Sequence, residues 1–392
     1  MTPKICFLSS YLTHHQLPFC LEMMTLTQGR FVFVETEQLP EERKNMGYAQ
    51  LGKQHDFVIC ACESPEKQAL AKKMADDAEI VIAGSAPDSY IRNRLKQNKL
   101  TFRYSERIFK RGYFDILRQL KYTLKTLPYR NKNLYYLLSS AYAAHDYYRC
   151  GAKPEKMFKW GYFPECIFYE DKNTLFANKQ KASILWAGRL LDWKHPEAAI
   201  RLAARLKQDG YTFTMQIIGN GEKEQSICEM IQRLELQNCV EMTGAMNAEE
   251  VRHQMEKSQI YLCTSDYNEG WGAVVNEAMN SGCAVVASHA CGSVPFLMEH
   301  GLNGLIYESE NEDQLYSLVT KLLQEPALCR QLGENALNTI CESWSAKIAA
   351  NKLMALCNSA ANIQPLTPTE NSGVTSFAKP IRQDKMYTSL RR

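Results

Sequence analysis

Two glutamates with seven residues between them lie in a glycine-bearing stretch of the second half of the chain, Asn268-Glu269-Gly270-Trp271-Gly272-Ala273-Val274-Val275-Asn276-Glu277. Gly270 and Gly272 would let the backbone approach a ligand closely. A helix beginning near Gly272 would offer unpaired N–H groups and a positive dipole end to a phosphate. The two carboxylates could then bind hydroxyl groups, so the stretch predicts a site for a phosphorylated, hydroxyl-rich ligand.

Two cations lie about 80 residues earlier, in Gly188-Arg189-Leu190-Leu191-Asp192-Trp193-Lys194-His195-Pro196. The planar fork of Arg189 and the point charge of Lys194 suit a diphosphate, although both could instead be solvated loop charges. No Asp-x-Asp triplet occurs in the chain, a pattern that often holds a divalent cation on a diphosphate. We therefore expect no metal and no cofactor, with basic residues and a helix terminus neutralising the phosphates.

Alternating apolar runs and amphipathic segments must position these residues. The predicted strands and helices of the first half are Ile5–Ser9, Gln16–Leu26, Phe31–Val34, Phe57–Cys60, Pro65–Ala75, Ile80–Ala83, Ile91–Asn98 and Leu100–Tyr104. Those of the second half are Ser183–Ala187, His195–Gln208, Thr214–Ile218, Glu222–Leu234, Val240–Thr243, Ala248–Lys257, Ile260–Thr264, Ala273–Asn280 and Ala284–Ser288. The alternation predicts two doubly wound α/β domains facing each other across a cleft, with ligands beyond the carboxyl ends of the strands.

The domain boundaries follow from turn formers and composition. We expect a first Rossmann-like domain over 1–165, a hinge after the turn formers of 151–164, and a second over 166–345. Residues 346–360 would form a helix returning toward the first domain. The stretch 361–392 is rich in Pro, Thr, Ser and Asn at its start, which favours a mobile tail.

The Glu-x7-Glu spacing and the Gly-Arg-Leu…Lys stretch resemble family 4 glycosyltransferases. Ser343-Trp344 also resembles the Ser-Trp element before the last helix of that family. The resemblance covers 183–345 well and the first domain more loosely, where Ser9–Pro18 lacks the Gly-Gly pair of many members. It implies the two-domain GT-B fold and transfer of a sugar from a nucleotide-diphosphate donor, a uridine diphosphate sugar by family frequency, with retention and without a metal.

The resemblance also implies a role for each residue of the motif. Arg189 and Lys194 would bind the donor diphosphate, Glu277 the ribose hydroxyls and Glu269 the donor sugar. The remaining contacts to the nucleotide would come from Gly219, Asn220, Gly221, Gly244, Gly270, Trp271, Gly272, Ala273 and Val274.

Candidate residues on the acceptor side lie after strands of the first domain. His14 and His15 follow the first predicted strand and could bond a phosphate or an acceptor hydroxyl, or be satisfied loop residues. Ser105 and Glu106 follow the strand Leu100–Tyr104, where many family members have a histidine. Glu106 could equally form an ordinary salt bridge with a neighbouring base.

A basic segment over 91–132 holds 13 Lys or Arg residues and two acids, interleaved with aromatic and aliphatic residues. This pattern favours contact with an anionic membrane over a charged face that is simply solvated. The expected acceptor is a saccharide or a lipid-linked saccharide. Nucleic acid could use the same charges, but no stacking motif accompanies them, so we expect no nucleic-acid partner.

The overall composition is that of an ordinary globular protein, with a net charge of +3. The 14 cysteines show no zinc or redox spacing, and no secretion signal or membrane span is apparent. We expect a cytoplasmic protein, peripheral on the inner face of the cell membrane. Two alternatives stay open at this point: a nucleotide-sugar epimerase of the same fold, and a non-catalytic nucleotide-sugar-binding module. A phosphorylase would need a pyridoxal lysine segment, which is not apparent.

Overall fold

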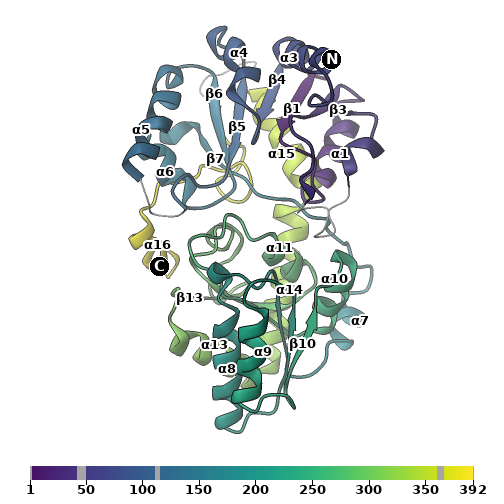
Figure 1. The fold of residues 1–392 in the computed structure, drawn as a ribbon, viewed down its shortest axis with the longest axis vertical. Coiled ribbons are helices and arrows are strands. Elements are labelled where there is room, and N and C mark those ends of the chain that lie inside the picture. The colour runs from purple at the N-terminus through teal and green to yellow at the C-terminus, as the bar shows by residue number, and fades with distance from the viewer. Residues whose placement is uncertain (1, 42–49, 111–114, 360–365, 392) are drawn as a thin grey trace. The chain divides into compact units, whose positions relative to one another are not determined.

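The computed structural model describes residues 2–41, 50–110, 115–359 and 366–391, which divide into two compact units (Figure 1). The first unit comprises Met1–Glu165 and Trp344–Arg382. The second comprises Cys166–Ser343 and Gln383–Arg392. The chain thus passes from the first unit to the second and back, and its final segment belongs to the second unit.

The first unit is built on a parallel sheet whose seven described strands run in the order β3-β2-β1-β4-β5-β6-β7. These strands are β1 Ile5–Ser9, β2 Phe31–Glu35, β3 Val58–Cys60, β4 Ile80–Ala83, β5 Thr101–Ser105, β6 Leu134–Leu138 and β7 Met157–Lys159. Continuous apolar runs such as β1 and β6 are buried along their whole length, as expected for strands covered on both faces.

The helices of the first unit are α1 Leu17–Leu26, α3 Pro65–Asp77, α4 Arg92–Lys96, α5 Asp115–Thr126, α6 Ala143–Arg149 and α15 Ala346–Ser359. Ser64 caps α3 by accepting a hydrogen bond from the Lys67 N–H, and Pro65 occupies its first turn. Helix α15 packs on α1, so a segment from the far end of the chain completes the first unit (Figure 1).

The second unit contains a parallel sheet in the order β10-β9-β8-β11-β12-β13, counted over its described residues. Its strands are β8 Ser183–Ala187, β9 Thr214–Ile218, β10 Val240–Gly244, β11 Ile260–Cys263, β12 Ala284–Ser288 and β13 Leu305–Tyr307. Strand order reverses between β8 and β11, which pair directly through Ile184–Ile260 and Leu185–Tyr261. Such a switch point leaves a gap between the loops at the carboxyl edge, where ligands of doubly wound sheets bind.

The helices of the second unit are α7 Lys172–Ala177, α8 Pro196–Gln208, α9 Glu224–Arg233, α10 Ala248–Lys257, α11 Ala273–Asn280, α12 Val294–Leu297, α13 Glu312–Gln324, α14 Pro326–Thr339 and α16 Gln383–Leu390. Asn247 and Glu250 form a reciprocal capping box at the start of α10. Apolar residues of α8, α9, α13 and α14 pack on the sheet in one core that includes Ile200, Ile227, Val319 and Leu332.

The structure confirms two doubly wound α/β units. The predicted bounds of β8, β9, α10, α11 and β12 agree with those observed. The prediction was incomplete in the first unit, where it stopped at Leu100–Tyr104 and omitted β6 and β7. Both strands are apolar and buried, but Tyr135, Tyr136 and flanking Lys residues obscure their pattern in the sequence.

The described part of the C-terminal segment is packed, which departs from the mobile tail that its composition favours. Phe377 forms a β-bridge with Phe158, and the backbone of Lys159 exchanges hydrogen bonds with Thr375 and Ser376. Farther on, the Tyr387 hydroxyl donates to Gln314 in the second unit. Composition alone missed these contacts because they are backbone bonds and a few buried side chains spread over many residues.

No helix in the part of the chain that the structure describes is both long and apolar enough to cross a membrane.

Arg94 is a buried charge that binds the backbone just before strands β4 and β5 of the first sheet. Its side chain is fully buried and donates hydrogen bonds to the backbone carbonyls of Ala75, Ala78, Glu79 and Leu100. Burial lowers the Arg94 pKa to about 10, so the group stays charged at neutral pH. One guanidinium therefore binds four backbone carbonyls, of which Leu100 O also accepts the Val81 N–H.

We predict that Arg94→Met lowers the free energy of unfolding of the first unit by about 2–4 kcal/mol, because it leaves buried carbonyls unpaired. The matched control is Arg92→Met, an exposed position on the same helix. Thermal unfolding followed by circular dichroism measures both. Equal midpoints for the two variants would show that the buried guanidinium does not stabilise this part of the sheet.

Candidate functional site

The loops after β8, β9 and β10 are joined by backbone hydrogen bonds. The Leu190 N–H donates to Asn220 O at 2.7 Å, and the Gly219 N–H donates to Gly244 O at 2.8 Å. Gly219 has a φ of +139°, and a Cβ there would lie 1.9 Å from Gly188 O. Only glycine permits this approach, so the two glycine-bearing loops are held against each other by backbone alone.

The loops after β8 and β11 are joined by a largely buried ion pair. Lys194 Nζ lies 2.5 Å from Glu269 Oε2, and each side chain is only 15% exposed. The Thr264 hydroxyl donates to Lys194 O at 2.5 Å and accepts from the Trp186 indole N–H at 2.9 Å. The lysine backbone is thereby tied to β11, next to the loop that carries Glu269.

The electrostatics of this pair favour a charged lysine. Burial acts to lower the Lys194 pKa, but the Glu269 carboxylate outweighs it and the net pKa is raised. The cation is therefore retained over the physiological pH range. It lies at the carboxyl edge of the sheet, beside the β8–β11 switch point.

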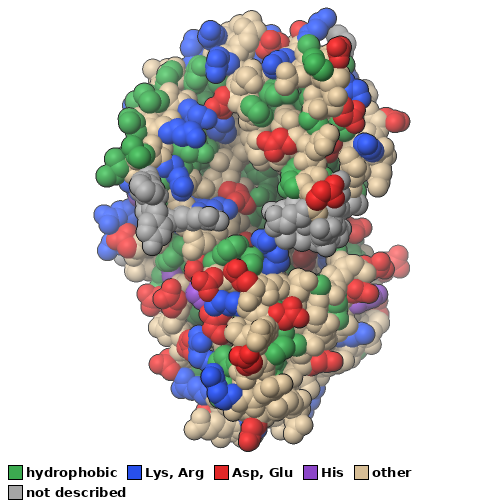
Figure 2. Space-filling view, in the orientation of Figure 1, with side chains coloured by type: hydrophobic (Ala, Val, Ile, Leu, Met, Phe, Trp, Pro, Cys, Tyr) green, Lys and Arg blue, Asp and Glu red, His purple; other side chains and the backbone are tan. Residues whose placement is uncertain are grey.

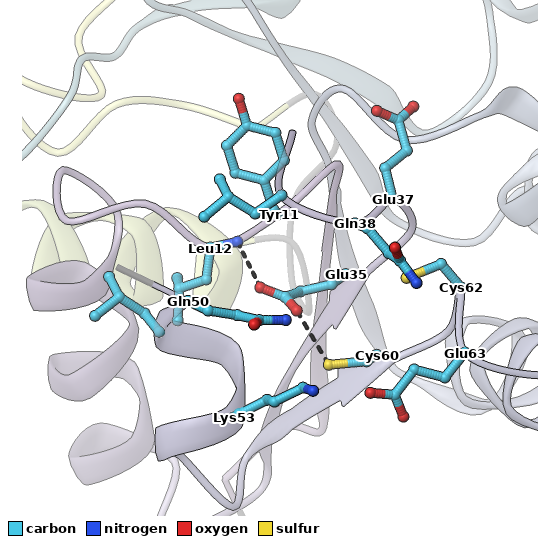
Figure 3. Close-up of a pocket in the computed structure, with 12 residues that line it drawn as sticks. Tyr11, Leu12, Glu35, Glu37, Gln38, Gln50, Lys53, Cys60, Cys62 and Glu63 are labelled. Atoms are coloured by element: carbon cyan, nitrogen blue, oxygen red, sulfur yellow. Dashed lines mark hydrogen bonds between the residues drawn. The ribbon is translucent and has the colours of Figure 1, made fainter. Parts of the chain in front are cut away.

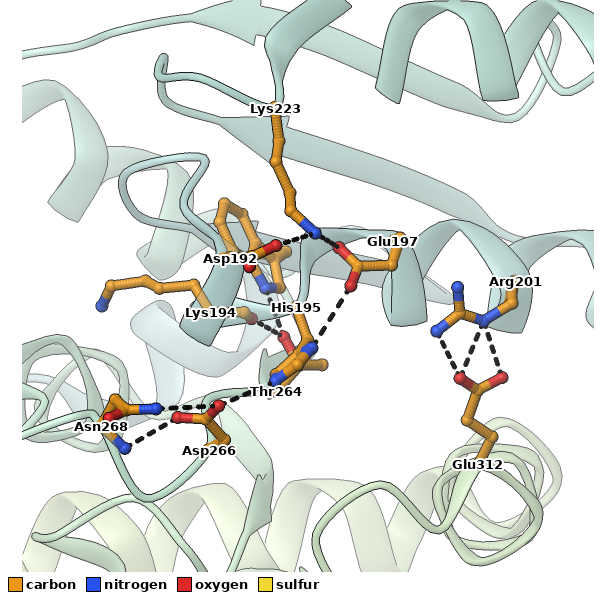
Figure 4. A network of polar contacts seen from close by, with 11 residues as sticks. Asp192, Lys194, His195, Glu197, Arg201, Lys223, Thr264, Asp266, Asn268 and Glu312 are labelled. Atoms are coloured by element: carbon orange, nitrogen blue, oxygen red, sulfur yellow. Dashed lines mark hydrogen bonds and ion pairs between the residues drawn. The ribbon is translucent and has the colours of Figure 1, made fainter. Parts of the chain in front are cut away.

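His195 joins the same two loops through a second, wider network (Figure 4). Its Nε2 lies 3.2 Å from Asp266 Oδ2, and its Nδ1 lies 3.2 Å from Glu197 Oε1. Asp266 also accepts the Asn268 backbone N–H at 2.7 Å, and Glu197 accepts Lys223 Nζ at 3.2 Å. The imidazole therefore links the helix after Lys194 to the loop that leads into Glu269.

This network was not anticipated from the sequence. Hydrogen bonds to Asp266 and Glu197 raise the His195 pKa to about 9, so the ring carries a positive charge at neutral pH. Its backbone is left-handed, with φ +46° and ψ +52°. The nearest signal in the sequence is an imidazole directly between Lys194 and a helix-starting proline, but its two carboxylate partners become neighbours only in the folded chain.

Helix α11 begins where the sequence predicts, after Gly272. This residue has φ +81°, and a Cβ there would lie 2.5 Å from Cys291 Sγ. Trp271 is buried, and its indole N–H donates to Asn276 Oδ1 at 2.8 Å, which fixes the turn into the helix. The N–H groups of Ala273 and Val274 lie in the first turn, where a helix provides no partner for them.

Glu277 and Arg189 are the remaining charged residues of the motif. Burial raises the Glu277 pKa to about 7, against the opposing charge of Arg252. Arg189 is half-buried, and among the described residues its guanidinium has no hydrogen bond or ion pair. Of the two cations in the motif, Lys194 is therefore paired with Glu269, whereas Arg189 is unpaired among the described residues.

The acceptor-side candidates all belong to the first unit. Glu106 forms an ion pair with Lys110 and accepts the Tyr162 hydroxyl at 2.5 Å, and the Ser105 hydroxyl donates to Glu106 O. The salt-bridge alternative for Glu106 is therefore the one observed. Contact of Ser105 or Glu106 with an acceptor stays a prediction.

The histidine loop after β1 presents one unusual group. Burial and the neighbouring His14 lower the His15 pKa to about 3, so its ring is neutral. The ring stacks on Tyr162, with centroids 5.9 Å apart, and its Nδ1 is buried without a hydrogen-bond partner among the described residues. The unpaired nitrogen of a neutral imidazole can accept a hydrogen bond or donate one, depending on its tautomer.

A polar cavity of about 220 Å³ lies at the carboxyl ends of β1, β2 and β3 (Figure 3). Glu35 lies in it and accepts the Leu12 N–H at 2.9 Å and the Cys60 thiol at 3.1 Å. Burial and this hydrogen bond raise the Cys60 pKa to about 12, so the thiol remains protonated. Glu35 therefore fixes the start of the loop that carries His14 and His15, a role that no sequence motif indicates.

The described geometry brings most of the predicted donor residues into one unit. Lys194 and Glu269 are in direct contact, and the Gly272 turn lies beside Glu269, whose Cγ would be 3.4 Å from a Cβ at that glycine. Asn220 and Gly244 are joined to the same loops through the backbone. The contacts to a ligand that the sequence assigns to each residue stay predictions.

Residues 168–339 match the family model described as glycosyl transferases group 1. The match covers most of the second unit. An uncharacterised glycosyltransferase of Haemophilus influenzae is 27% identical over 44% of the chain and 50% of that relative. The amylovoran biosynthesis glycosyltransferase AmsK of Erwinia amylovora is 29% identical over 45% of the chain and 44% of the relative. The chain thus matches about half the length of these relatives.

A solved structure extends the fold similarity to both units of this chain. The crystal structure of Anabaena HepE in complex with UDP superposes with a TM-score of 0.69 over 91% of this chain and 100% of that one, at 16% identity. The likeness confirms the predicted GT-B fold. The family match itself ends before α15.

The His195 network predicts a pH-dependent stability of the second unit. The folded pKa of about 9 lies above the ordinary value of 6.5, so the stabilisation is complete below pH 6.5 and is lost as pH rises through 9. Allowing for solvent screening, we expect a loss of about 1–2 kcal/mol. Urea unfolding at a series of pH values measures it.

His195→Gln should remove most of this dependence, and His253→Gln, at an exposed position on α10, should retain it. If wild type and His195→Gln lose stability in parallel between pH 6.5 and 9, the imidazole does not hold the two loops together.

Proposed function

We propose that this protein is a retaining, metal-independent glycosyltransferase of family 4. It would move a sugar from a nucleotide-diphosphate donor to a saccharide or lipid-linked saccharide in the synthesis of a surface polysaccharide or glycolipid. The observation that carries the proposal is the Lys194–Glu269 pair beside the start of α11, within a segment that matches group 1 glycosyltransferases.

The diphosphate would be bound by the first turn of α11 together with Arg189 and Lys194. The N–H groups of Ala273 and Val274 supply hydrogen bonds and the positive end of the helix dipole. The Arg189 guanidinium has no protein partner within the described residues, so binding a phosphate breaks no existing ion pair. These groups are in place before the reaction and stabilise the charge that develops on the leaving group.

Glu277 would accept hydrogen bonds from the ribose hydroxyls, and its position within α11 is set by the same helix that binds the phosphates. Uridine is our proposal for the base. The HepE structures in complex with UDP and with UDP-glucose support it, since they share the fold at 16% and 17% identity. Glu269 would orient the donor sugar.

Transfer with retention needs no protein nucleophile. The acceptor hydroxyl oxygen bonds to the anomeric carbon on the face from which the diphosphate leaves. The bond from that carbon to the phosphate oxygen breaks, its electron pair stays on the diphosphate, and the departing phosphate takes the acceptor proton. The ion pair of Glu269 with Lys194 supports an orienting role, because a carboxylate held by a cation is a weakened nucleophile.

If the acceptor is lipid-linked, the enzyme would bind it at a membrane surface. We assign this contact to the exposed basic residues of the segment 91–132, which has 13 Lys or Arg residues against two acids. Arg94 and Arg107 are buried and take no part in it. The cytoplasmic leaflet carries negative surface potential, so the proposal places the enzyme on the inner face of the cell membrane.

We predict that Lys194→Ala and Glu277→Ala each reduce turnover by about a hundredfold or more, the scale of losing a preorganised charge contact. Release of nucleoside diphosphate from a panel of donors, with membrane extract as acceptor, measures turnover. Lys207→Ala is the control, since this exposed lysine on α8 donates to Glu235 O and is not part of the proposed site.

Wild-type rates in both site variants would refute the proposed donor site. Donor binding by the wild type without turnover across a broad acceptor panel would favour a non-catalytic module. Release of sugar without any acceptor would favour the epimerase.

We further predict that excess EDTA leaves turnover unchanged within about twofold, because two cations and a helix terminus already neutralise the diphosphate. Addition of Mg²⁺ or Mn²⁺ after EDTA treatment is the control. A loss of activity that either cation restores would show that the leaving group needs a metal.

A further inference from the structure

Helix α5, Asp115–Thr126, turns its apolar side outward. Ile116, Leu117, Leu120 and Leu124 are 83%, 65%, 56% and 66% exposed, and Leu127 just beyond the helix is 48% exposed. At 100° per residue the five side chains fall within an arc of about 100°, the width of a stripe that would normally face a core. Here that stripe faces solvent.

The opposite side of α5 is anchored to the first unit by polar and aromatic contacts. The Gln119 amide donates to Arg149 O at 3.1 Å and accepts from the Arg149 guanidinium at 2.8 Å. The Tyr122 ring packs edge-on against Tyr147, and Thr126 is buried. The helix is therefore held in place by its less apolar side, and the exposed leucines are not needed to attach it.

Basic residues flank the apolar stripe. Lys121 and Lys125 lie along one side of it on the helix, and Arg130 follows the 3₁₀ turn Leu127–Tyr129. Lys125 pairs with Asp88, whereas the side chains of Lys121 and Arg130 have no ion pair among the described residues. In Figure 2, hydrophobic side chains and Lys or Arg side chains gather side by side over this region of the first unit. The surface is thus apolar at its centre and positive at its edge.

This combination selects among possible partners. A nucleic acid would neutralise the cations but leave five aliphatic side chains exposed, and the stripe offers no aromatic ring for a base to stack on. A symmetric pairing of two copies would bring the same cations near one another. An anionic bilayer accepts aliphatic side chains below its headgroups and pairs the flanking cations with phosphates.

We propose that α5 is a membrane-docking helix that lies in the surface of an anionic bilayer. Ile116, Leu117, Leu120, Leu124 and Leu127 enter the acyl boundary, and Lys121 and Arg130 contact lipid phosphates. The docking of α5 is argued independently of the proposed glycosyltransferase function. Only its benefit, access to a lipid-linked acceptor, rests on that function.

Flotation with vesicles tests the docking without any donor or acceptor. We expect wild type to bind vesicles of phosphatidylcholine and phosphatidylglycerol at about 7:3, with much weaker binding to phosphatidylcholine alone. Leu120→Glu with Leu124→Glu should reduce the bound fraction by about tenfold or more. Lys121→Gln with Arg130→Gln should reduce it by a similar factor and remove most of its salt dependence.

The matched control is Leu21→Glu with Leu70→Glu, two leucines 45% and 48% exposed on α1 and α3, which should bind like wild type. Thermal midpoints establish that each variant is folded. Lys194→Ala should also float like wild type, so a failed donor site and a failed docking surface give different results.

Equal flotation of wild type and the Leu120/Leu124 variant would overturn the proposal. So would equal binding of wild type to vesicles with and without phosphatidylglycerol. If wild type does not float and the leucine variant instead dissolves a dimer seen by light scattering, the stripe is an interface between copies of this chain and the bilayer assignment is wrong.

Discussion

The ion pair between Lys194 and Glu269 is the interaction on which the proposed donor site depends. Each side chain is largely buried, so each would leave an uncompensated charge if its partner were removed, at a cost of several kcal/mol. The pair can form only if the loops after β8 and β11 meet, and the strand order makes them neighbours at the switch point of the sheet. Topology therefore supplies the proximity, and the loops' own contacts set the geometry.

Two kinds of contact hold those loops in place. Around Gly219 the backbones approach so closely that any side chain would collide, which fixes the loops by shape. Around His195 a charged imidazole between Asp266 and Glu197 fixes them by electrostatics. The first kind is insensitive to pH and the second is not. A site that must keep a lysine aligned with a leaving group gains rigidity from both, because small displacements weaken preorganised charge contacts strongly.

The sequence predicted best where one residue type reports directly on local structure. Gly272 at the start of α11 and the apolar run of β8 were readable, because a left-handed turn needs glycine and a buried parallel strand needs a continuous apolar run. His195 was not readable in the same way, since its partners lie 2 and 71 residues away and meet it only after folding. The outward face of α5 was equally hidden. Helical periodicity shows that one side is apolar, but not which side meets the protein.

Lys194 and Arg189 differ in whether a carboxylate already binds them, and this difference predicts different roles in the proposed site. In the proposed donor site a diphosphate would share Lys194 with Glu269, so the full attraction of this lysine would become available only as the leaving group gains charge. Arg189 has no such competitor among the described residues and could give its whole charge to the ligand at once. Arg189 would then contribute chiefly to binding of the donor in its ground state. Lys194 would contribute chiefly to the step in which the bond to the sugar breaks, because it answers charge that appears during the reaction.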